Sequence, residues 1–349
     1  MFKKNIRFMI LSLLIAVFSI WAVSSMSSNF TVAQLCDDLT DANMFWIGLA
    51  LVLMPGFIIF EGFAVASLVK GLCGKKAYRK GIVYGAADVY FSAITPSASG
   101  GQPASAFFMM WDGITAAQTT VILLVNLIMY SLALLLCGAV AFICAIPLFL
   151  SYDIFAMVLI VVGIFAMFGL LILFILLLKK EEIIRKIAYW LIKLGSKIHI
   201  IRKPEKYVEK LDRLTSQYKN SANAMKGKRK ILLEALFFNI LQRLSQSMVT
   251  VCVYLGMEGN LRHAFKVWLV QMLSALGSNS IPIPGGMGVA DYLLLQGLEK
   301  IEGVDSVVNL ELVCRGLSFY GCVVTSIVII LVGYLLRIRK NNPLKEENK

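Results

Sequence analysis

The strongest constraint on this chain is a series of apolar runs long enough to cross a membrane as helices. A bilayer core requires roughly 20 apolar residues in helical form. Uninterrupted runs of that size lie at 6–26, 44–69, 119–146, 154–178, 231–257 and 307–336. Apolar residues make up 58% of the sequence and charged residues 16%, and the mean hydropathy is +0.77. Because soluble domains contain about a quarter charged residues, the sequence predicts an all-α integral membrane protein with six full spans.

Two further apolar stretches, 82–110 and 263–298, are interrupted at their centres. The first contains the sequence TPSASGGQP at 95–103, and the second contains IPIPGGMG at 281–288. Proline and paired glycines do not continue a helix comfortably. Each limb has about a dozen residues, or roughly 18 Å of helix, which is too short to cross the bilayer. Each stretch is therefore predicted to be a re-entrant hairpin whose broken apex reaches the middle of the membrane.

The distribution of positive charge supports these two hairpins. Lys plus Arg total 34 against 21 Asp plus Glu, a formal net charge of +13. If both broken stretches return to the side from which they enter, all basic segments face the cytoplasm, as the positive-inside rule requires. These segments are residues 3–7, the 75–80 loop, the stretch 179–230 and the basic end of the last span. Such charge beside lipid indicates contact with the anionic inner leaflet more than with nucleic acid.

The spans and hairpins fall into two halves of opposite orientation. In the first half a span runs inward, a hairpin enters from the cytoplasm and a span runs outward; in the second half each direction is reversed. Inverted repeats of this kind place the substrate sites of many transporters at mid-membrane, between broken helices. Coincidence within a short series of spans is the alternative. The predicted divisions are an anchor span with an external loop (1–43), a first membrane half (44–178), a basic amphipathic cytoplasmic segment (179–230), a second membrane half (231–340) and a cytoplasmic tail (341–349).

Two segments leave alternatives open. The first span ends in VSSMSS at 23–28, which also suits a cleavable signal peptide, but its long apolar run favours an uncleaved anchor. In the cytoplasmic segment, apolar residues from Ile183 to Ile198 share one helical face opposite Lys and Arg, as in a helix lying at the lipid interface. A second helical pattern follows Pro204. A solvated linker fits the segment equally well.

Two arginines inside the membrane segments are candidates for substrate binding. Arg243 lies near the middle of its predicted span, and Arg315 lies a few turns into the last one. Charge at such depth is costly and marks a functional site by default. We expect both arginines to face a polar cavity and to hold a lipid phosphate, because a guanidinium fork matches phosphate geometry. Structural pairing of either arginine with Asp291 or Glu61 is an equal alternative.

Carboxylates in the same segments have a different candidate role. Glu61, Asp88 and Asp291 are candidates for ion or proton coupling. Glu234 and Glu311 lie close to span ends and are expected to be interfacial. The chain contains no phosphate-binding P-loop motif, so direct use of ATP is not predicted.

The two apices are candidate head-group sites. At each apex, glycines precede a returning helix, whose first backbone N–H groups lack intrahelical partners and attract anions. Glycine also lets backbone and ligand approach closely. The predicted substrate contacts at the apices are Ser99, Gly100, Gly101, Gln102, Gly285, Gly286 and Gly288. The alternative is that these small residues only let the hairpins pack together.

Cysteine and histidine usage indicates no metal centre, cofactor or nucleophilic catalyst. Six of the seven cysteines lie in or beside hydrophobic segments, without the spacing of a disulfide framework or a zinc site. The two histidines, His199 and His263, are far apart in the sequence. We therefore predict neither catalytic nor metal-binding residues.

Several of these motifs resemble those of a known family. The sequence TPSASGGQP, followed by WDGI at 111–114, and the sequence IPIPGGMGVAD at 281–291 resemble the two hallmark motifs of the lysylphosphatidylglycerol synthase transmembrane family, also called flippase-like. Cys314 and Arg315, with Ser318, Phe319 and Tyr320, resemble the Trp-Arg and paired-aromatic signature of its last span. The sequence departs from the family at Cys314, where Trp is usual, and at Asp291, where Glu is.

The resemblance implies a function in bacterial lipid metabolism. In the multiple peptide resistance factor, a membrane region of this kind moves lysylphosphatidylglycerol to the outer leaflet, and a separate cytosolic domain makes that lipid from lysyl-tRNA. The expected function is therefore translocation of an anionic or lysylated phospholipid, with a contribution to cationic peptide resistance. The expected location is the bacterial plasma membrane, with both termini cytoplasmic.

Two other functions stay open beside translocation. The chain could be a phosphatidylglycerol lysyltransferase, which would bind charged tRNA as the lysyl donor. It could also be a membrane partner of a separate lipid synthase. The chain ends at Lys349, shortly after its last predicted span, so we expect the soluble catalytic domain to be missing and transferase activity by this chain alone to be absent.

Overall fold

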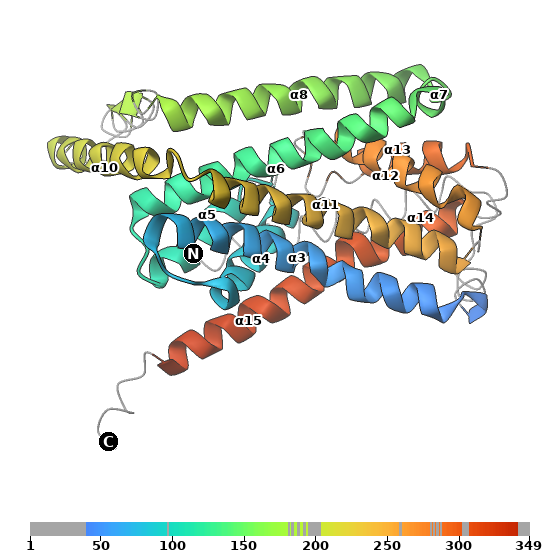
Figure 1. Ribbon diagram of the computed structural model, residues 1–349, viewed down its shortest axis with the longest axis horizontal. Coiled ribbons are helices and arrows are strands. Elements are labelled where there is room, and N and C mark those ends of the chain that lie inside the picture. The colour runs from blue at the N-terminus through green and yellow to red at the C-terminus, as the bar shows by residue number, and fades with distance from the viewer. Residues whose placement is uncertain are drawn as a thin grey trace.

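The computed structural model describes residues 40–95, 98–180, 204–257, 260–279, 288–301 and 307–340, with scattered positions in 182–194 and 281–286. Every element of this described part is a helix, in agreement with the predicted all-α fold (Figure 1). Three predicted features lie wholly or mostly outside the described residues: the first span at 6–26, the amphipathic pattern at 183–198 and the tail at 341–349.

The helices follow one another along the chain with few residues between them. They are α3 (Met44–Cys73), α4 (Tyr78–Ala93), α5 (Gly101–Trp111), α6 (Ala116–Cys144), α7 (Ile146–Phe149), α8 (Ile154–Lys179), α10 (Pro204–Met225), α11 (Arg229–Met257), the 3-10 helix η2 (Leu261–His263), α12 (Ala264–Ser278), α13 (Val289–Leu298), α14 (Val307–Arg315), the π-helix η4 (Gly316–Gly321) and α15 (Cys322–Lys340). The helix predicted after Pro204 is present as α10.

Four helices in the described part of the chain are long and apolar enough to span a membrane. They are α3, α6, α8 and the continuous helix Val307–Ile338, which joins α14, η4 and α15. The chain is therefore a membrane protein. α11 occupies the place of the predicted span 231–257 and has 29 residues, but polar side chains make it less apolar than those four. The predicted count of six spans stays a prediction.

Local capping fixes where the long helices begin and end. The side chain of Asn43 accepts a backbone hydrogen bond at the start of α3, and Gly74, with φ of 68°, ends that helix in the left-handed conformation. Thr115 and Gln118 form a capping box at the start of α6. Asp153 accepts a hydrogen bond from the first turn of α8.

Two pairs of short helices interrupt this pattern at the predicted motifs. α4 ends at Ala93 and α5 begins at Gly101, whereas α12 ends at Ser278 and α13 begins at Val289. These helices have 10 to 16 residues, or about 15–24 Å, against a bilayer core of about 30 Å. Figure 1 shows the α4–α5 pair toward one end of the bundle and the α12–α13 pair toward the other. Two hairpins of opposite orientation require such a placement toward opposite ends of the bundle. Their re-entrant position in a membrane stays a prediction.

Small residues let the helices of the first half approach closely. A Cβ atom on Gly85 of α4 would lie 2.7 Å from the backbone nitrogen of Gly62 and 2.8 Å from the carbonyl oxygen of Ile58, both in α3. Close backbone contact of this kind is common between membrane helices. Along its length, α3 also lies beside α11 (Figure 1). α11 in turn contacts α6 and α12, so it connects both halves of the bundle.

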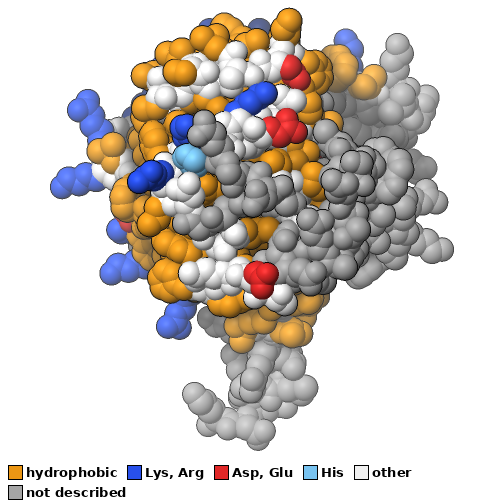
Figure 2. Space-filling view, turned by 90° about the vertical axis from the view of Figure 1, so that its right-hand side faces the viewer, with side chains coloured by type: hydrophobic (Ala, Val, Ile, Leu, Met, Phe, Trp, Pro, Cys, Tyr) orange, Lys and Arg blue, Asp and Glu red, His pale blue; other side chains and the backbone are white. Residues whose placement is uncertain are grey.

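The outer surface of the bundle is strongly hydrophobic. Along α8, large apolar side chains such as Ile154 and Phe165 are 76% and 72% exposed. Figure 2 views one end of the molecule and shows hydrophobic side chains over much of the described surface, with Lys and Arg projecting along one edge and a few charged side chains nearer the middle. An apolar surface of this extent would be unfavourable in water and suits contact with lipid.

Candidate functional site

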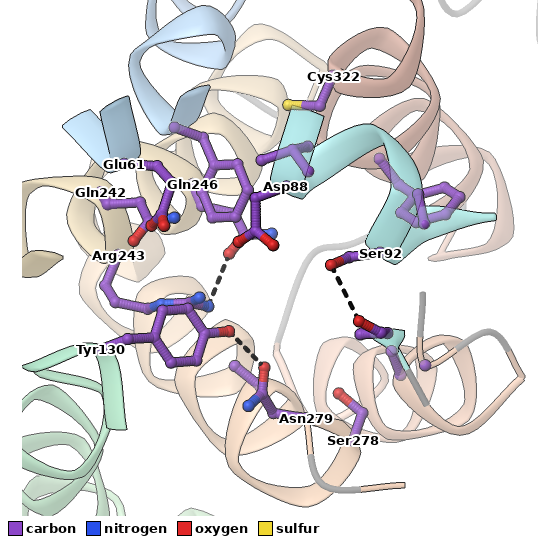
Figure 3. Close-up of a pocket in the computed structure, with 18 of the residues that line it drawn as sticks. Glu61, Asp88, Ser92, Tyr130, Gln242, Arg243, Gln246, Ser278, Asn279 and Cys322 are labelled. Carbon is purple, nitrogen blue, oxygen red and sulfur yellow. Dashed lines mark hydrogen bonds between the residues drawn. The ribbon is translucent and has the colours of Figure 1, made fainter. Parts of the chain in front are cut away.

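A cavity of about 470 Å³ lies between the two helix breaks (Figure 3). Ser99 and Gln102 reach it from the first break, and Asn279 and Gly286 reach it from the second. The other walls come from α3, α4, α6, α8, α11, α12, α13, α14, η4 and α15. Segments far apart in the sequence therefore converge on one space.

Most of the predicted site residues lie in the wall of this cavity. Those residues are Glu61, Asp88, Ser99, Gln102, Arg243, Gly286 and Arg315. Gly100, Gly101, Gly288 and Asp291 are placed next to the breaks but do not line the cavity. Gly285 lies outside the described residues.

The glycines of the first break serve the packing of the break itself. A Cβ atom on Gly101 would collide with the side chains of Asp88 and Ser92 on α4. The backbone N–H of Gly100 donates a hydrogen bond to Oγ1 of Thr95 at 2.8 Å. These contacts all lie within the first hairpin, whereas Gln102 and Ser99 line the cavity.

The start of α13 is capped from within the chain. Gly288 has φ of 81°, and its N–H donates a hydrogen bond to Oδ2 of Asp291 at 2.8 Å. A carboxylate in the first turn complements the positive end of the helix dipole. The anion position predicted for this helix start is thus occupied by the carboxylate of Asp291.

Arg243 is buried in the cavity wall and holds its guanidinium mostly through neutral groups. Nη1 donates a hydrogen bond to Oε1 of Gln246 at 3.1 Å (Figure 3). The guanidinium carbon lies 4.2 Å from the ring centroid of Tyr130 and 5.5 Å from that of Phe57. Nε of Arg243 has no hydrogen-bond partner, and no ion pair of this residue occurs in the described part of the chain. Within the described residues, this charge is therefore not held in a direct ion pair.

Glu61 ends a buried chain of polar side chains beside Arg243. Its Oε1 accepts a hydrogen bond from Asn126 at 2.7 Å, and Asn126 accepts one from Asn239 at 3.2 Å. Oε2 of Glu61 is buried without a partner among the described residues. Asp88 accepts a hydrogen bond from Gln102 at 3.1 Å. Two carboxyl groups thus share the cavity with Arg243.

Arg315 is paired, in contrast to Arg243. Its Nε contacts Oδ1 of Asp291, and Oε1 of Glu311 lies 4.0 Å away. The guanidinium carbon also lies 5.3 Å from the ring centroid of Phe319. Glu311 lies in the first turns of the helix Val307–Ile338, and its side chain is only 1% exposed beside Asp291 and Arg315. Four residues separate Glu311 from Arg315, so one helical face carries both.

Sequence reasoning missed the neutral polar residues that complete the cavity. Asn126 and Tyr130 lie one turn apart on α6, and Gln242 and Gln246 lie one turn apart on α11. Tyr130 also donates a hydrogen bond to Asn279 at 2.8 Å, which links α6 to the second break (Figure 3). Polar residues at a spacing of four within an apolar run were the signal that could have found them.

Comparison with known proteins supports the resemblance seen in the motifs. The profile of the family described as lysylphosphatidylglycerol synthase TM region matches residues 9–326. No curated protein and no solved structure matches the chain. The family match includes both helix breaks, Arg243 and Arg315. The chain therefore belongs to the lysylphosphatidylglycerol synthase transmembrane family.

Proposed function

We propose that the protein translocates a membrane phospholipid, of an anionic or lysylated kind such as lysylphosphatidylglycerol. The family gives a general role in the synthesis or translocation of that lipid. Translocation requires a polar site within the membrane for the head group and an apolar surround for the acyl chains. The cavity between the helix breaks offers the first, and the exposed hydrophobic helices offer the second.

The observation that carries this proposal is the state of Arg243. A buried guanidinium is costly, and Arg243 has no carboxylate within ion-pair distance among the described residues, so it can bind an anion directly in the cavity. A lipid phosphate can accept two parallel hydrogen bonds from such a fork. Gln246 and Tyr130 hold the guanidinium in place without neutralising it.

The dimensions and lining of the cavity suit a lipid head group. A volume of about 470 Å³ falls within the range of small-molecule sites, roughly 300–1,000 Å³. Gln102, Gln271, Ser278 and Asn279 supply neutral hydrogen-bonding groups for the glycerol or aminoacyl part. On α8, Met167, Leu170 and Phe174 form an apolar section of the wall.

The wider setting follows from the same proposal. The protein would act in the bacterial plasma membrane, with both termini and its basic loops at the anionic inner leaflet. Movement of a lysylated lipid to the outer leaflet would reduce its negative charge and the binding of cationic peptides. A separate lipid synthase would supply the substrate.

The direct test measures lipid movement in proteoliposomes. Fluorescent phosphatidylglycerol or lysylphosphatidylglycerol is placed in both leaflets, and a membrane-impermeant quencher reports the outer fraction. We expect the wild type to increase exchange between leaflets, Arg243→Gln to abolish the increase and Arg243→Lys to retain part of it, because lysine keeps the charge but not the fork. Arg79→Gln is a matched control, since Arg79 is exposed on α4 away from the cavity.

Two outcomes would contradict the proposal. One is a wild-type protein that leaves the leaflet distribution unchanged under every imposed gradient. The other is a purified protein that converts lysyl-tRNA and phosphatidylglycerol into lysylphosphatidylglycerol, since that reaction would identify the lysyltransferase alternative.

A further inference from the structure

We infer that Glu61 and Asp88 form a proton-binding site of the cavity, and that an anionic head group bound at Arg243 brings a proton onto this carboxyl pair. The identity of the ligand, a lipid head group, rests on the proposed function. The proton site itself rests on how the charged groups of the cavity are arranged.

The two carboxyl groups come from different helices and face the same space. Glu61 is on α3 and is 2% exposed, while Asp88 is on α4, and both line the cavity (Figure 3). The hydrogen-bonding side chains around them are neutral: Asn126 and Gln242 lie beside Glu61, and Gln102 and Ser92 lie beside Asp88. Neither carboxyl is in an ion pair in the part of the chain that the structure describes.

The charged groups around Glu61 and Asp88 favour a proton on this carboxyl pair. The charged and titratable side chains that face the carboxyl pair, taken from every element of the described cavity wall, are Glu61 (α3), Asp88 (α4), Tyr130 (α6), Arg243 (α11), Arg315 (α14) and Cys322 (α15). Tyr130 and Cys322 are neutral near pH 7. The charge of Arg315 is already balanced by Asp291. Two carboxylates then share the single charge of Arg243, which leaves one negative charge uncompensated at a depth where charge is costly.

A proton on either carboxyl removes this excess. Two interacting acids bind and release protons as a unit, so one shared proton satisfies both. Oε2 of Glu61, which is buried and has no hydrogen-bond partner among the described residues, is a position where a carboxyl proton or its acceptor fits. The geometry favours a proton over a metal cation, because no third carboxylate, histidine or cysteine joins the pair in a metal-binding group among the described residues.

The second carboxyl cluster differs in ways that make it structural. Asp291 caps α13 through Gly288 and contacts Arg315. Glu311 and Asp291 also lie behind the wall and do not line the cavity. A proton on Asp291 would break a helix cap and an ion pair, and Glu311 does not reach the cavity, whereas a proton can enter and leave the Glu61–Asp88 pair without loss of a salt bridge.

Binding of an anion at Arg243 connects this site to transport. A phosphate at the guanidinium takes up the positive charge that the two carboxylates otherwise share. It also brings further negative charge into the same low-dielectric space. Both effects favour proton binding by the pair, so the head group and a proton enter the cavity together.

The test measures proton uptake on ligand binding in detergent. Short-chain phosphatidylglycerol is added to the full-length protein in weak buffer that contains a pH indicator. We expect uptake of about one proton per bound lipid, because the pair titrates as a unit. Glu61→Gln and Asp88→Asn should each reduce uptake at least several-fold, while the matched control Glu234→Gln, at a carboxyl that pairs with Tyr78 and Lys70 outside the cavity, should keep it.

A second measurement covers variants that fail to fold. A hydrophobic carbodiimide reacts with protonated carboxyl groups, so on wild-type protein it should label residue 61 or 88, more strongly at lower pH. Mass spectrometry locates the label. Lipid binding without proton uptake, or no label at either residue across the pH range in which the protein stays folded, would overturn the inference.

The two proposals fail in different ways. Lipid translocation that shows no proton uptake and no response to a pH gradient would remove the proton site but leave the proposed function intact. A response to a sodium gradient in place of a pH gradient would also overturn the proton assignment. Proton uptake and labelling in a protein that moves no lipid would leave the proton site standing and contradict translocation.

Discussion

The guanidinium of Arg337 on α15 holds the carboxylate of Asp112, which follows α5, with hydrogen bonds from Nη2 at 2.7 Å and from Nε at 3.2 Å. The same carboxylate accepts a hydrogen bond from Tyr84 at 2.6 Å and pairs with Lys80 at 3.1 Å. The side chains of Arg337 and Asp112 are only 12% and 9% exposed. α4, α5 and the last helix are therefore joined at one point, away from the cavity.

Asp112→Asn should destabilise the protein markedly. The change leaves the guanidinium of Arg337 largely buried without its anion, and loss of one partner of such a pair costs about 3 kcal/mol. Thermal unfolding in detergent measures the effect. A double-mutant cycle with Arg337→Gln should show coupling between the two sites. If the effects of the two substitutions simply add, the contact does not stabilise the fold.

The same carboxylate makes stability dependent on pH. Burial by itself would raise the pKa of Asp112, but hydrogen bonds from Arg337 and Tyr84 outweigh it and hold the pKa below the ordinary value of 3.8. A lowered pKa in the folded state contributes stability that is fully present above the unfolded value and is lost as pH falls through the folded one. Wild-type protein should therefore lose more stability than Asp112→Asn when the pH is lowered below about 4. Parallel losses in both proteins would contradict this assignment.

The sequence predicted the breaks in the helices well because their cause is local. Proline and glycine in TPSASGGQP and IPIPGGMG end helices by their own geometry, and α4, α5, α12 and α13 end or begin at those motifs. Asp112 lies in the recognised WDGI motif, but its partner Arg337 lies more than 200 residues further along the chain. A contact of that kind is decided by tertiary packing and leaves no periodic signal.

Gly85→Ala should weaken the packing of α4 against α3. The new Cβ atom would lie 2.7 Å and 2.8 Å from backbone atoms of α3, which cannot move aside as a flexible side chain can. Overpacking of this kind costs about 1–3 kcal/mol. Gly169→Ala is the control, because a Cβ atom there meets nothing within 4 Å, and it should be neutral or stabilising by up to about 1 kcal/mol. Equal melting temperatures for the two variants would refute the proposed close contact.

The two arginines should respond differently to removal. Arg315→Ala leaves Asp291 and Glu311 buried without their cation, so we expect a loss of about 3–5 kcal/mol, partly restored by adding Asp291→Asn. Arg243→Ala leaves no salt-bridged carboxylate behind and should cost less stability while it abolishes lipid movement. Melting curves and translocation assays on the same preparations separate these effects. A more severe loss of stability at Arg243 would assign it a structural role.

The difference between the two arginines was beyond the reach of the sequence. Substrate binding and structural pairing were equal alternatives for both Arg243 and Arg315, and the two side chains have different neighbours in the structure. Arg315 contacts Asp291 across the second break, while the neighbours of Arg243 are Gln246, Tyr130 and Phe57. Hydropathy predicted that Glu311 lies near the end of a span, but it does not show which side chains pack around that residue.

The position of α8 has a consequence for how a lipid reaches the interior. Met167, Leu170 and Phe174 line the cavity, while Phe165, Phe168 and Leu173 on the same helix are exposed on the outside of the bundle. On this side one helix, about 10 Å thick, forms the partition between the chamber and the surrounding acyl chains. If the protein moves lipids as proposed, a sideways displacement of this helix would open the cavity to the bilayer, so that a head group enters while its acyl chains stay in the hydrocarbon region.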